Sequence, residues 1–199
     1  MKISTIVLTG GNSKRMGQPK YRLRFGPETL LERTLRQVGQ STRIVVASHQ
    51  QVLPDLGDVI VVRDPVEDQG PLLGIMAGLR EAGKFSEWAL VIGCDMPFVN
   101  RDLIDLLIDH RKEGDDIIIP QIGDQAYPLC ALYRTEVWQV AQALLAEGER
   151  RLLALLEPCE VNLVGKEALV KLDPDLIFLT NINTPESYED ALARAHLKK

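Results

Sequence analysis

The chain has 199 residues, of which 45% are hydrophobic and 26% are charged, as is usual for a folded globular protein. This composition excludes a disordered chain, and no run approaches the roughly 20 apolar residues that a membrane-spanning helix needs. The net charge of -5 opposes binding to nucleic acid, so an anionic partner must be attracted by a local group of cations.

Short apolar runs alternate with longer helical patterns over about the first 140 residues. The runs are nearly continuous, as expected for strands that are covered on both faces of a sheet. They lie at residues 3–9, 43–48, 59–62, 88–93 and 117–120. Helical spacing of apolar residues is found at 29–40, 71–81 and 101–111. Strands that alternate with helices predict an α/β fold, a Rossmann-like, doubly wound, mostly parallel sheet with helices on both faces.

The rest of the chain is less regular. Strands are predicted at residues 127–133, 161–164 and 177–180, and helices at residues 136–146, 151–157 and 187–195. No linker, repeat or change in composition separates this part from the first. We therefore expect a single domain over residues 1–199, with a small elaboration after about residue 120.

A glycine-rich basic segment follows the first predicted strand. Residues 8–20 read LTGGNSKRMGQPK, and the first 27 residues contain six basic residues and no acidic one. Glycines at the end of a strand let the backbone approach a ligand, and successive N–H groups there can bind phosphate. Arg15 can hold a phosphate with two hydrogen bonds and Lys20 adds a mobile charge, which together suit a triphosphate. A solvated turn has the same composition, however.

Two carboxylates occupy the ends of predicted strands. Asp95 follows the apolar strand at 88–93, and this position faces the crevice where open α/β sheets bind ligands. Magnesium favours hard oxygen ligands and needs only one or two carboxylates beside substrate phosphates, so Asp95 is a candidate ligand; helix capping is the alternative. Asp64, in the segment RDPVEDQGPLLGI, could contact a nucleotide or simply belong to a strand-to-helix turn.

Two asparagines lie near the end of the chain, in the segment TNINTPE. Asn181 and Asn183 alternate along a stretch that we expect to be extended, so both amides could face one side and bind a phosphate or a pterin. Asn, Thr and Pro are also common where a strand gives way to a helix, and on the residues alone this turn chemistry is the stronger interpretation.

Several motifs in order resemble those of the molybdenum cofactor guanylyltransferases, a branch of the nucleotidyltransferase superfamily. They are Leu-x-Gly-Gly-x-Ser-x-Arg-Met-Gly-x-x-Lys, Gly-Pro-Leu-x-Gly-Ile, Cys-Asp-x-Pro-Phe, Pro-Leu-x-Ala-Leu-Tyr and Asn-x-Asn-Thr-Pro-Glu. The resemblance covers nearly the whole chain. It departs at Thr9, where the family usually has Ala.

The resemblance implies a nucleotide-diphospho-sugar transferase type of fold and a cytoplasmic, magnesium-dependent enzyme. Such an enzyme transfers GMP from GTP to the phosphate of molybdopterin and releases pyrophosphate, with about residues 1–120 binding the nucleotide and about 121–199 the acceptor. Arg15, Lys20 and Asp95 would be catalytic, with Asp95 as the metal ligand. The implied nucleotide contacts are Leu8, Thr9, Gly10, Gly11, Arg15, Lys20, Asp64 and Asp95, and the implied acceptor contacts are Asn181 and Asn183. Transient contact with molybdenum cofactor delivery proteins or recipient molybdoenzymes would accompany this role.

Other functions remain open from the sequence. A molybdopterin cytidylyltransferase, or another small-molecule nucleotidyltransferase, shares the first loop and the strand-end Asp. A non-catalytic nucleotide-binding protein would not need Arg15, Lys20 and Asp95 together. A nicotinamide-linked oxidoreductase or a Walker-type ATPase would need a glycine pattern that the chain lacks. The three cysteines and three histidines are scattered, which argues against a zinc site and for reduced thiols.

Overall fold

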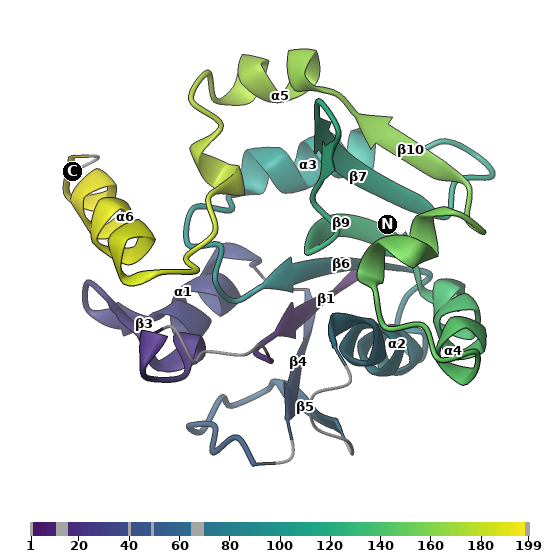
Figure 1. Cartoon of the computed structure of the whole chain (residues 1–199), viewed down its shortest axis with the longest axis horizontal. Helices are drawn as coiled ribbons and strands as arrows, with labels where there is room; N and C mark the ends of the chain where they lie inside the picture. The colour runs from purple at the N-terminus through teal and green to yellow at the C-terminus, as the bar shows by residue number, and fades with distance from the viewer. Residues whose placement is uncertain (1, 11–15, 40, 49, 65–69, 198–199) are drawn as a thin grey trace.

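The structure is a computed structural model that describes residues 2–10, 16–39, 41–48, 50–64 and 70–197. Its centre is a mixed sheet with the strand order β10-β7-β9-β6-β1-β4-β5 (Figure 1). The bounds of these strands, in chain order, are β1 (Ile3–Leu8), β4 (Thr42–Ser48), β5 (Ile60–Asp64), β6 (Trp88–Gly93), β7 (Ile117–Ile122), β9 (Cys130–Arg134) and β10 (Val161–Val164). A short strand, β8 (Gln125–Ala126), pairs with β7, and β2 (Arg24–Phe25) pairs with β3 (Glu28–Thr29) in a separate ribbon.

The sheet is mostly parallel, as the alternation of strands and helices predicts. β1 pairs in parallel with both β4 and β6, β5 pairs in parallel with β4, and β10 pairs in parallel with β7. The exception is β9, which lies antiparallel between β6 and β7. Leu8 is in register with Gly93, so β1 and β6 end side by side at one edge of the sheet.

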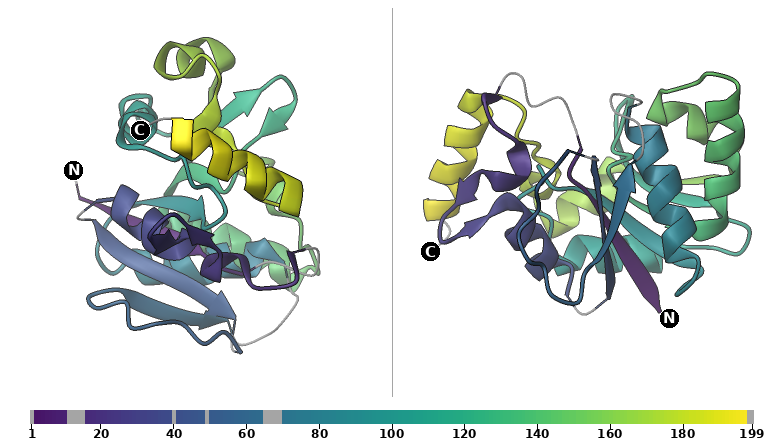
Figure 2. Two further views of the ribbon diagram at one scale, coloured as in Figure 1. Left: turned by 90° about the vertical axis from the view of Figure 1, so that its left-hand side faces the viewer. Right: turned by 90° about the horizontal axis from the view of Figure 1, so that it is seen from below.

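Helices cover both faces of the sheet (Figure 2). α2 (Pro71–Ala82) and α4 (Trp138–Ala146) pack on the face that receives Ile6 and Leu8 of β1. α1 (Leu30–Gln37) packs on the opposite face against Val7, and α3 (Arg101–Asp109) and α5 (Lys166–Leu172) cover the rest of that side. Successive residues of β1 thus point into different cores, which explains why its sequence is apolar without a break.

Local signals in the sequence fix several helix ends. Thr29 and Glu32 form a capping box at the start of α1, and Asn100 accepts a hydrogen bond from the Leu103 N–H at the start of α3. Pro71 begins α2 after Gly70, whose φ of 78° is in the left-handed region.

Two predictions in the later part need correction. The predicted strand at 177–180 is wrong: Ile177–Leu179 form a 3₁₀ helix that is not part of the sheet, and their side chains are buried. A short apolar run satisfies either conformation, and periodicity cannot separate them. The predicted helix at 151–157 is a 3₁₀ helix over Leu152–Leu156, and α5 was not predicted.

The first and last segments of the described chain pack together. α6 (Pro185–Leu197) lies beside the β2-β3 ribbon in both views of Figure 2. A separate apolar cluster joins them; its buried members are Leu23, Phe25, Leu30, Ile182 and Ala191. The Tyr188 hydroxyl donates a hydrogen bond to the Arg24 carbonyl. Within the residues that the structure describes, no helix is long and apolar enough to cross a membrane.

Candidate active site

Asp95 stands two residues beyond the end of β6, as the sequence predicts. Its turn is held on both sides by backbone hydrogen bonds: the Gly93 N–H donates to the Leu129 carbonyl (2.9 Å), and the Cys94 N–H donates to the Leu8 carbonyl (3.1 Å). A third bond, from the Ile182 N–H to the Asp95 carbonyl (2.9 Å), ties the turn to the end of the chain. The carboxylate therefore projects from a rigid support at the edge where β1 and β6 end.

Lys20 lies directly against this carboxylate. Its Nζ is 2.8 Å from Asp95 Oδ2, and the two side chains are only 16% and 19% exposed. Lys20 begins a 3₁₀ turn (Lys20–Arg22) whose middle residue, Tyr21, is buried and donates a hydrogen bond from its hydroxyl to the Val52 carbonyl (3.1 Å). The buried tyrosine thus fixes the backbone from which Lys20 reaches Asp95.

Asn183 completes this group. Its Oδ1 accepts a hydrogen bond from Lys20 Nζ at 2.5 Å, although 163 residues separate the two in the sequence. Ile182, which is fully buried beside Leu23 and Phe25, holds the asparagine in place. One ammonium group therefore bridges a carboxylate oxygen and an amide oxygen, and Asn183 lies on the same side of the fold as Asp95. Asn181 is exposed.

A partly buried network anchors the start of the glycine-rich segment. The Thr9 hydroxyl lies 3.0 Å from the Val46 carbonyl and 2.9 Å from Gln51 Oε1, and Gln51 Nε2 donates to the Thr9 carbonyl (2.9 Å). Gln51 Oε1 also accepts from the Ser48 N–H at 2.9 Å. The hydroxyl that distinguishes Thr9 from the usual alanine is thus used to join the ends of β1 and β4. Gln51 was not among the predicted site residues.

The remaining predicted residues are placed only in part. Leu8 is the last residue of β1, and Gly10 is exposed two positions later. Gly11 and Arg15 lie outside the described residues. Asp64 is the last residue of β5, at the same edge of the sheet, but its side chain is outside the described part of the structure. Of the two cations that were expected to face Asp95, the structure therefore describes one, Lys20, and it contacts the carboxylate.

Two neighbours of Asp95 define its surroundings. A β-carbon added at Gly93 would lie 2.6 Å from Asp95 Oδ1, so the carboxylate occupies space that only a glycine leaves free. The Cys94 thiol is buried, and its pKa is raised first by that burial and then by the Asp95 charge. A thiol held neutral in this way is a packing group and a poor nucleophile.

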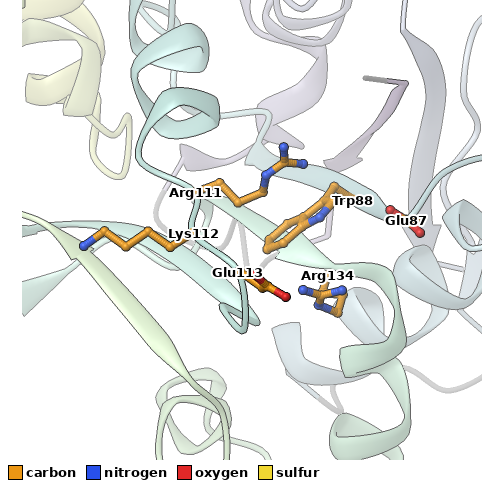
Figure 3. Close-up of a pocket in the computed structure, with 6 residues that line it drawn as sticks. All are labelled: Glu87, Trp88, Arg111, Lys112, Glu113 and Arg134. Atoms are coloured by element: carbon orange, nitrogen blue, oxygen red, sulfur yellow. The ribbon is translucent and has the colours of Figure 1, made fainter.

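A hollow lies at the opposite end of β6 from Asp95, around Trp88 (Figure 3). Its lining residues are Glu87, Trp88, Arg111, Lys112, Glu113 and Arg134. The guanidinium carbons of Arg111 and Arg134 lie 5.5 Å and 5.1 Å from the centre of the Trp88 ring, and Arg134 also donates to the Asp115 carbonyl. Three cations face two carboxylates here, so the charge is nearly balanced and ill suited to a triphosphate.

The site at the strand ends has the character of an enzyme that handles nucleotide phosphates. Open α/β sheets bind nucleotides beyond the carboxyl ends of their strands, and here that edge carries a glycine-rich entry, a lysine and an aspartate. Among the described residues, no three His, Cys, Asp or Glu side chains are grouped as a metal-binding cluster. Fold and site together define a nucleotidyltransferase class of α/β protein.

Comparison with known proteins gives the family. Residues 5–161 match the MobA-like NTP transferase domain, and the chain belongs to this family. It is 31% identical to a probable molybdenum cofactor guanylyltransferase from Bacillus mycoides, with 96% of each chain covered. The chain is thus a nucleotidyltransferase.

Solved structures agree with this assignment. A molybdopterin-guanine dinucleotide biosynthesis protein A from Archaeoglobus fulgidus superimposes with a TM-score of 0.84, at 28% identity over 98% of this chain and 99% of that one. A 2-C-methyl-D-erythritol 4-phosphate cytidylyltransferase from Thermus thermophilus superimposes with a TM-score of 0.71 at 20% identity, over 98% of this chain and 100% of that one. The second comparison shows the fold alone, and that fold is of the nucleotide-diphospho-sugar transferase type.

Proposed function

We propose that this chain transfers GMP from GTP to the phosphate of molybdopterin, giving the molybdopterin guanine dinucleotide and pyrophosphate. The observation that carries the proposal is the contact of Lys20 with Asp95 at the ends of β1 and β6. The names of the relatives, a guanylyltransferase and a protein of molybdopterin-guanine dinucleotide biosynthesis, supply the substrates.

The nucleotide lies, in this proposal, across the ends of β1 and β6. Leu8, Thr9, Gly10 and Gly11 line the base and phosphates with backbone groups, and Asp64 contacts the nucleotide from the end of β5. Arg15 and Lys20 neutralise the triphosphate and the pyrophosphate that leaves. The network of Gln51 and Thr9 supports this role because it fixes the start of the loop before a ligand arrives.

Magnesium fits the oxygen atoms that the site presents. The Lys20 ammonium shows that a cation is accommodated between Asp95 Oδ2 and Asn183 Oδ1, and both are the hard oxygen donors that Mg²⁺ prefers. Asp95, with Asn183 beside it, would hold the ion. Bound there, Mg²⁺ would neutralise charge on the triphosphate and the departing pyrophosphate.

The acceptor phosphate needs no general base. A phosphate monoester is already anionic at neutral pH, so it can attack the α-phosphorus in line without losing a proton to the protein. Rate enhancement must then come from alignment of the two substrates and from cationic stabilisation of the leaving group. The absence of an acid–base pair from the predicted site residues accords with this mechanism.

The acceptor side belongs to the later part of the chain. We assign about residues 1–120 to the nucleotide and about residues 121–199 to molybdopterin, with Asn181 and Asn183 as contacts to the acceptor. The position of Asn183 against Lys20 would place the acceptor next to the triphosphate. Cytoplasmic location, and transient contact with delivery proteins or recipient molybdoenzymes, stay predictions from the family resemblance.

A comparison of four nucleotides tests the reaction and the base together. Purified protein is mixed with molybdopterin, Mg²⁺ and ATP, CTP, GTP or UTP, and pyrophosphate release is followed. We expect turnover with GTP to exceed that with the other three. A preference for CTP would establish the alternative, a molybdopterin cytidylyltransferase, and release with none of the four would contradict nucleotidyl transfer to this acceptor.

Two variants test the assigned residues. Asp95→Asn should lower kcat by about 100-fold because it removes the negative charge that holds the divalent ion, and Lys20→Ala should weaken GTP binding and slow turnover by roughly 10-fold or more each. Asp105→Asn and Lys84→Ala remove the same groups from exposed ion pairs elsewhere and should leave kcat and KM unchanged. Full activity of Asp95→Asn would reject the metal role.

A further inference from the structure

We propose that Lys20 and the divalent cation compete for one position, so that the metal reaches Asp95 only when a triphosphate draws the lysine away. The inference rests on the proposed function and concerns how the same site is controlled. In this proposal, Lys20 neutralises Asp95 in the nucleotide-free protein and binds phosphate when a triphosphate is bound.

The ammonium group of Lys20 occupies the position that a metal ion held by Asp95 and Asn183 would take. Lys20 Nζ lies 2.8 Å from Asp95 Oδ2 and 2.5 Å from Asn183 Oδ1, so two oxygens from distant parts of the chain converge on one cation. The other carboxylate oxygen, Oδ1, is turned toward Gly93, 2.6 Å from where a β-carbon would lie. An ion that binds both Oδ2 and Asn183 Oδ1 would therefore take the position that the Lys20 ammonium group now holds.

Electrostatics makes the two states exclusive. A divalent ion bound to Asp95 Oδ2 would lie within a few ångströms of the ammonium group, beside Lys20 and Asp95 side chains that are only 16% and 19% exposed, with the exposed Asn183 next to them. Like charges at such separations repel, and they do so more strongly where the groups are mostly buried than in open water. Lys20 must move before the ion can be held.

The structure allows the side chain to move while its backbone stays in place. The buried Tyr21 and its hydrogen bond to the Val52 carbonyl fix the turn, whereas the lysine stem has four rotatable bonds. A triphosphate offers several anionic oxygens in exchange for one carboxylate. Nucleotide and metal should then raise each other's affinity. The nucleotide draws Lys20 away from Asp95, and the metal neutralises the carboxylate that Lys20 leaves.

Binding of Mn²⁺ to the nucleotide-free protein tests the proposal without any catalytic readout. Free Mn²⁺ is measured by electron paramagnetic resonance during titration of the wild type and of Lys20→Met, which keeps the bulk of the side chain and removes its charge. We expect Lys20→Met to bind Mn²⁺ at least fivefold more tightly. A tenfold change would correspond to about 1.4 kcal/mol.

A matched variant separates displacement from a general loss of charge. Arg22→Met removes one positive charge from the same turn, but Arg22 donates to the Val52 carbonyl and does not hold Asp95. We expect its Mn²⁺ affinity to stay within twofold of the wild type. Equal affinities of Lys20→Met and the wild type would overturn the proposal, and so would equal tightening by Arg22→Met and Lys20→Met.

The double variant Lys20→Met/Asp95→Asn distinguishes failure of this inference from failure of the proposed function. It should lose the tightened Mn²⁺ site, while circular dichroism and thermal unfolding confirm that it folds. If it binds Mn²⁺ as tightly as Lys20→Met does, the ion is not held by Asp95, and the proposed metal site itself is wrong. If it loses binding but Lys20→Met shows no tightening, the metal site stands and the competition does not.

Discussion

Gly93 sets the position of the Asp95 carboxylate through the space that it leaves empty. Asp95 Oδ1 lies 2.6 Å from the position of an added β-carbon, closer than two such atoms can approach. The atom in the way is the end of a short side chain at the surface of the site, so a methyl group would be accommodated by rotating the carboxylate. The cost should fall on function and little on folding.

Gly93→Ala should therefore lower turnover and Mn²⁺ affinity by about 10-fold or more, with a change in the free energy of unfolding below about 1 kcal/mol. Gly165→Ala is the control because a β-carbon there meets no atom within 4 Å. Kinetics, metal titration and denaturant unfolding of both variants decide the matter. Unchanged turnover in Gly93→Ala would show that the carboxylate does not need its present orientation.

The sequence predicts some contacts of the candidate site and not others, for physical reasons. Lys20 and Asp95 could be predicted because a glycine-rich segment and a strand-end carboxylate meet at the same edge of a parallel sheet. Gln51 carries no such signal: a glutamine shortly after a strand is common, and its bonds to Thr9 appear only in three dimensions. Asn183 was expected near a ligand, but its contact with Lys20 depends on how the chain returns to its beginning.

At the scale of elements, α2 has two glycines that face the sheet, and the space beside them differs. A β-carbon at Gly78 would lie 2.6 Å from Ile6 Cγ2 and 3.1 Å from Val46 Cγ2, so the helix approaches β1 and β4 closely there. One turn earlier, a β-carbon at Gly74 would lie 3.5 Å from Leu8 Cδ2, an ordinary packing distance. The helix that begins within the Gly-Pro-Leu-x-Gly-Ile motif thus packs closely on the strand that leads into the glycine-rich segment.

Gly78→Ala should lower the free energy of unfolding by about 1–3 kcal/mol, because the buried methyl group forces the helix off the sheet. Gly74→Ala, the matched control, should be neutral or stabilising by up to about 1 kcal/mol, since alanine favours the helix and the space is available. Denaturant unfolding measures both. Equal effects at the two positions would contradict the close contact at Gly78.

The sequence predicts where the strands lie better than it predicts their order and direction in the sheet. Apolar runs reveal β1, β4, β5, β6 and β7, and alternation with helices indicates that the sheet is mostly parallel. The run that forms β9 looks the same, yet β9 enters antiparallel between β6 and β7. Because both kinds of buried strand have apolar residues on both faces, the pattern holds no information on direction. The pattern also fails to distinguish a short strand from a short helix, as the 3₁₀ helix at Ile177–Leu179 shows.

At the scale of the whole molecule, the candidate active site brings together segments from opposite ends of the described chain. Ile182 is fully buried in the cluster with Leu23, Phe25 and Leu30, and its N–H bonds to the Asp95 carbonyl. This packing brings Asn183 to Lys20. The sheet supplies the carboxylate and the loop, whereas the late segment supplies the amide.

Ile182→Ala should cost about 2–4 kcal/mol of unfolding free energy and should also weaken GTP binding by the folded protein, because both Asn183 and Lys20 lose support. Ile117→Ala is the control: Ile117 is equally buried, but it lies at the amino end of β7. It should destabilise the fold by a similar amount and leave GTP affinity unchanged. Calorimetric titration at a temperature where both variants are folded separates the two effects.

The meeting of Lys20 with Asn183 has a consequence for synthesis. A ribosome that adds about 5–20 residues each second needs roughly 8–30 s to travel the 163 residues from one to the other. During that interval the emerging polypeptide carries its lysine and later its aspartate, but no amide from the final segment. A growing chain would thus lack the amide side of this group until the segment around Asn183 has been made and has packed against the earlier part.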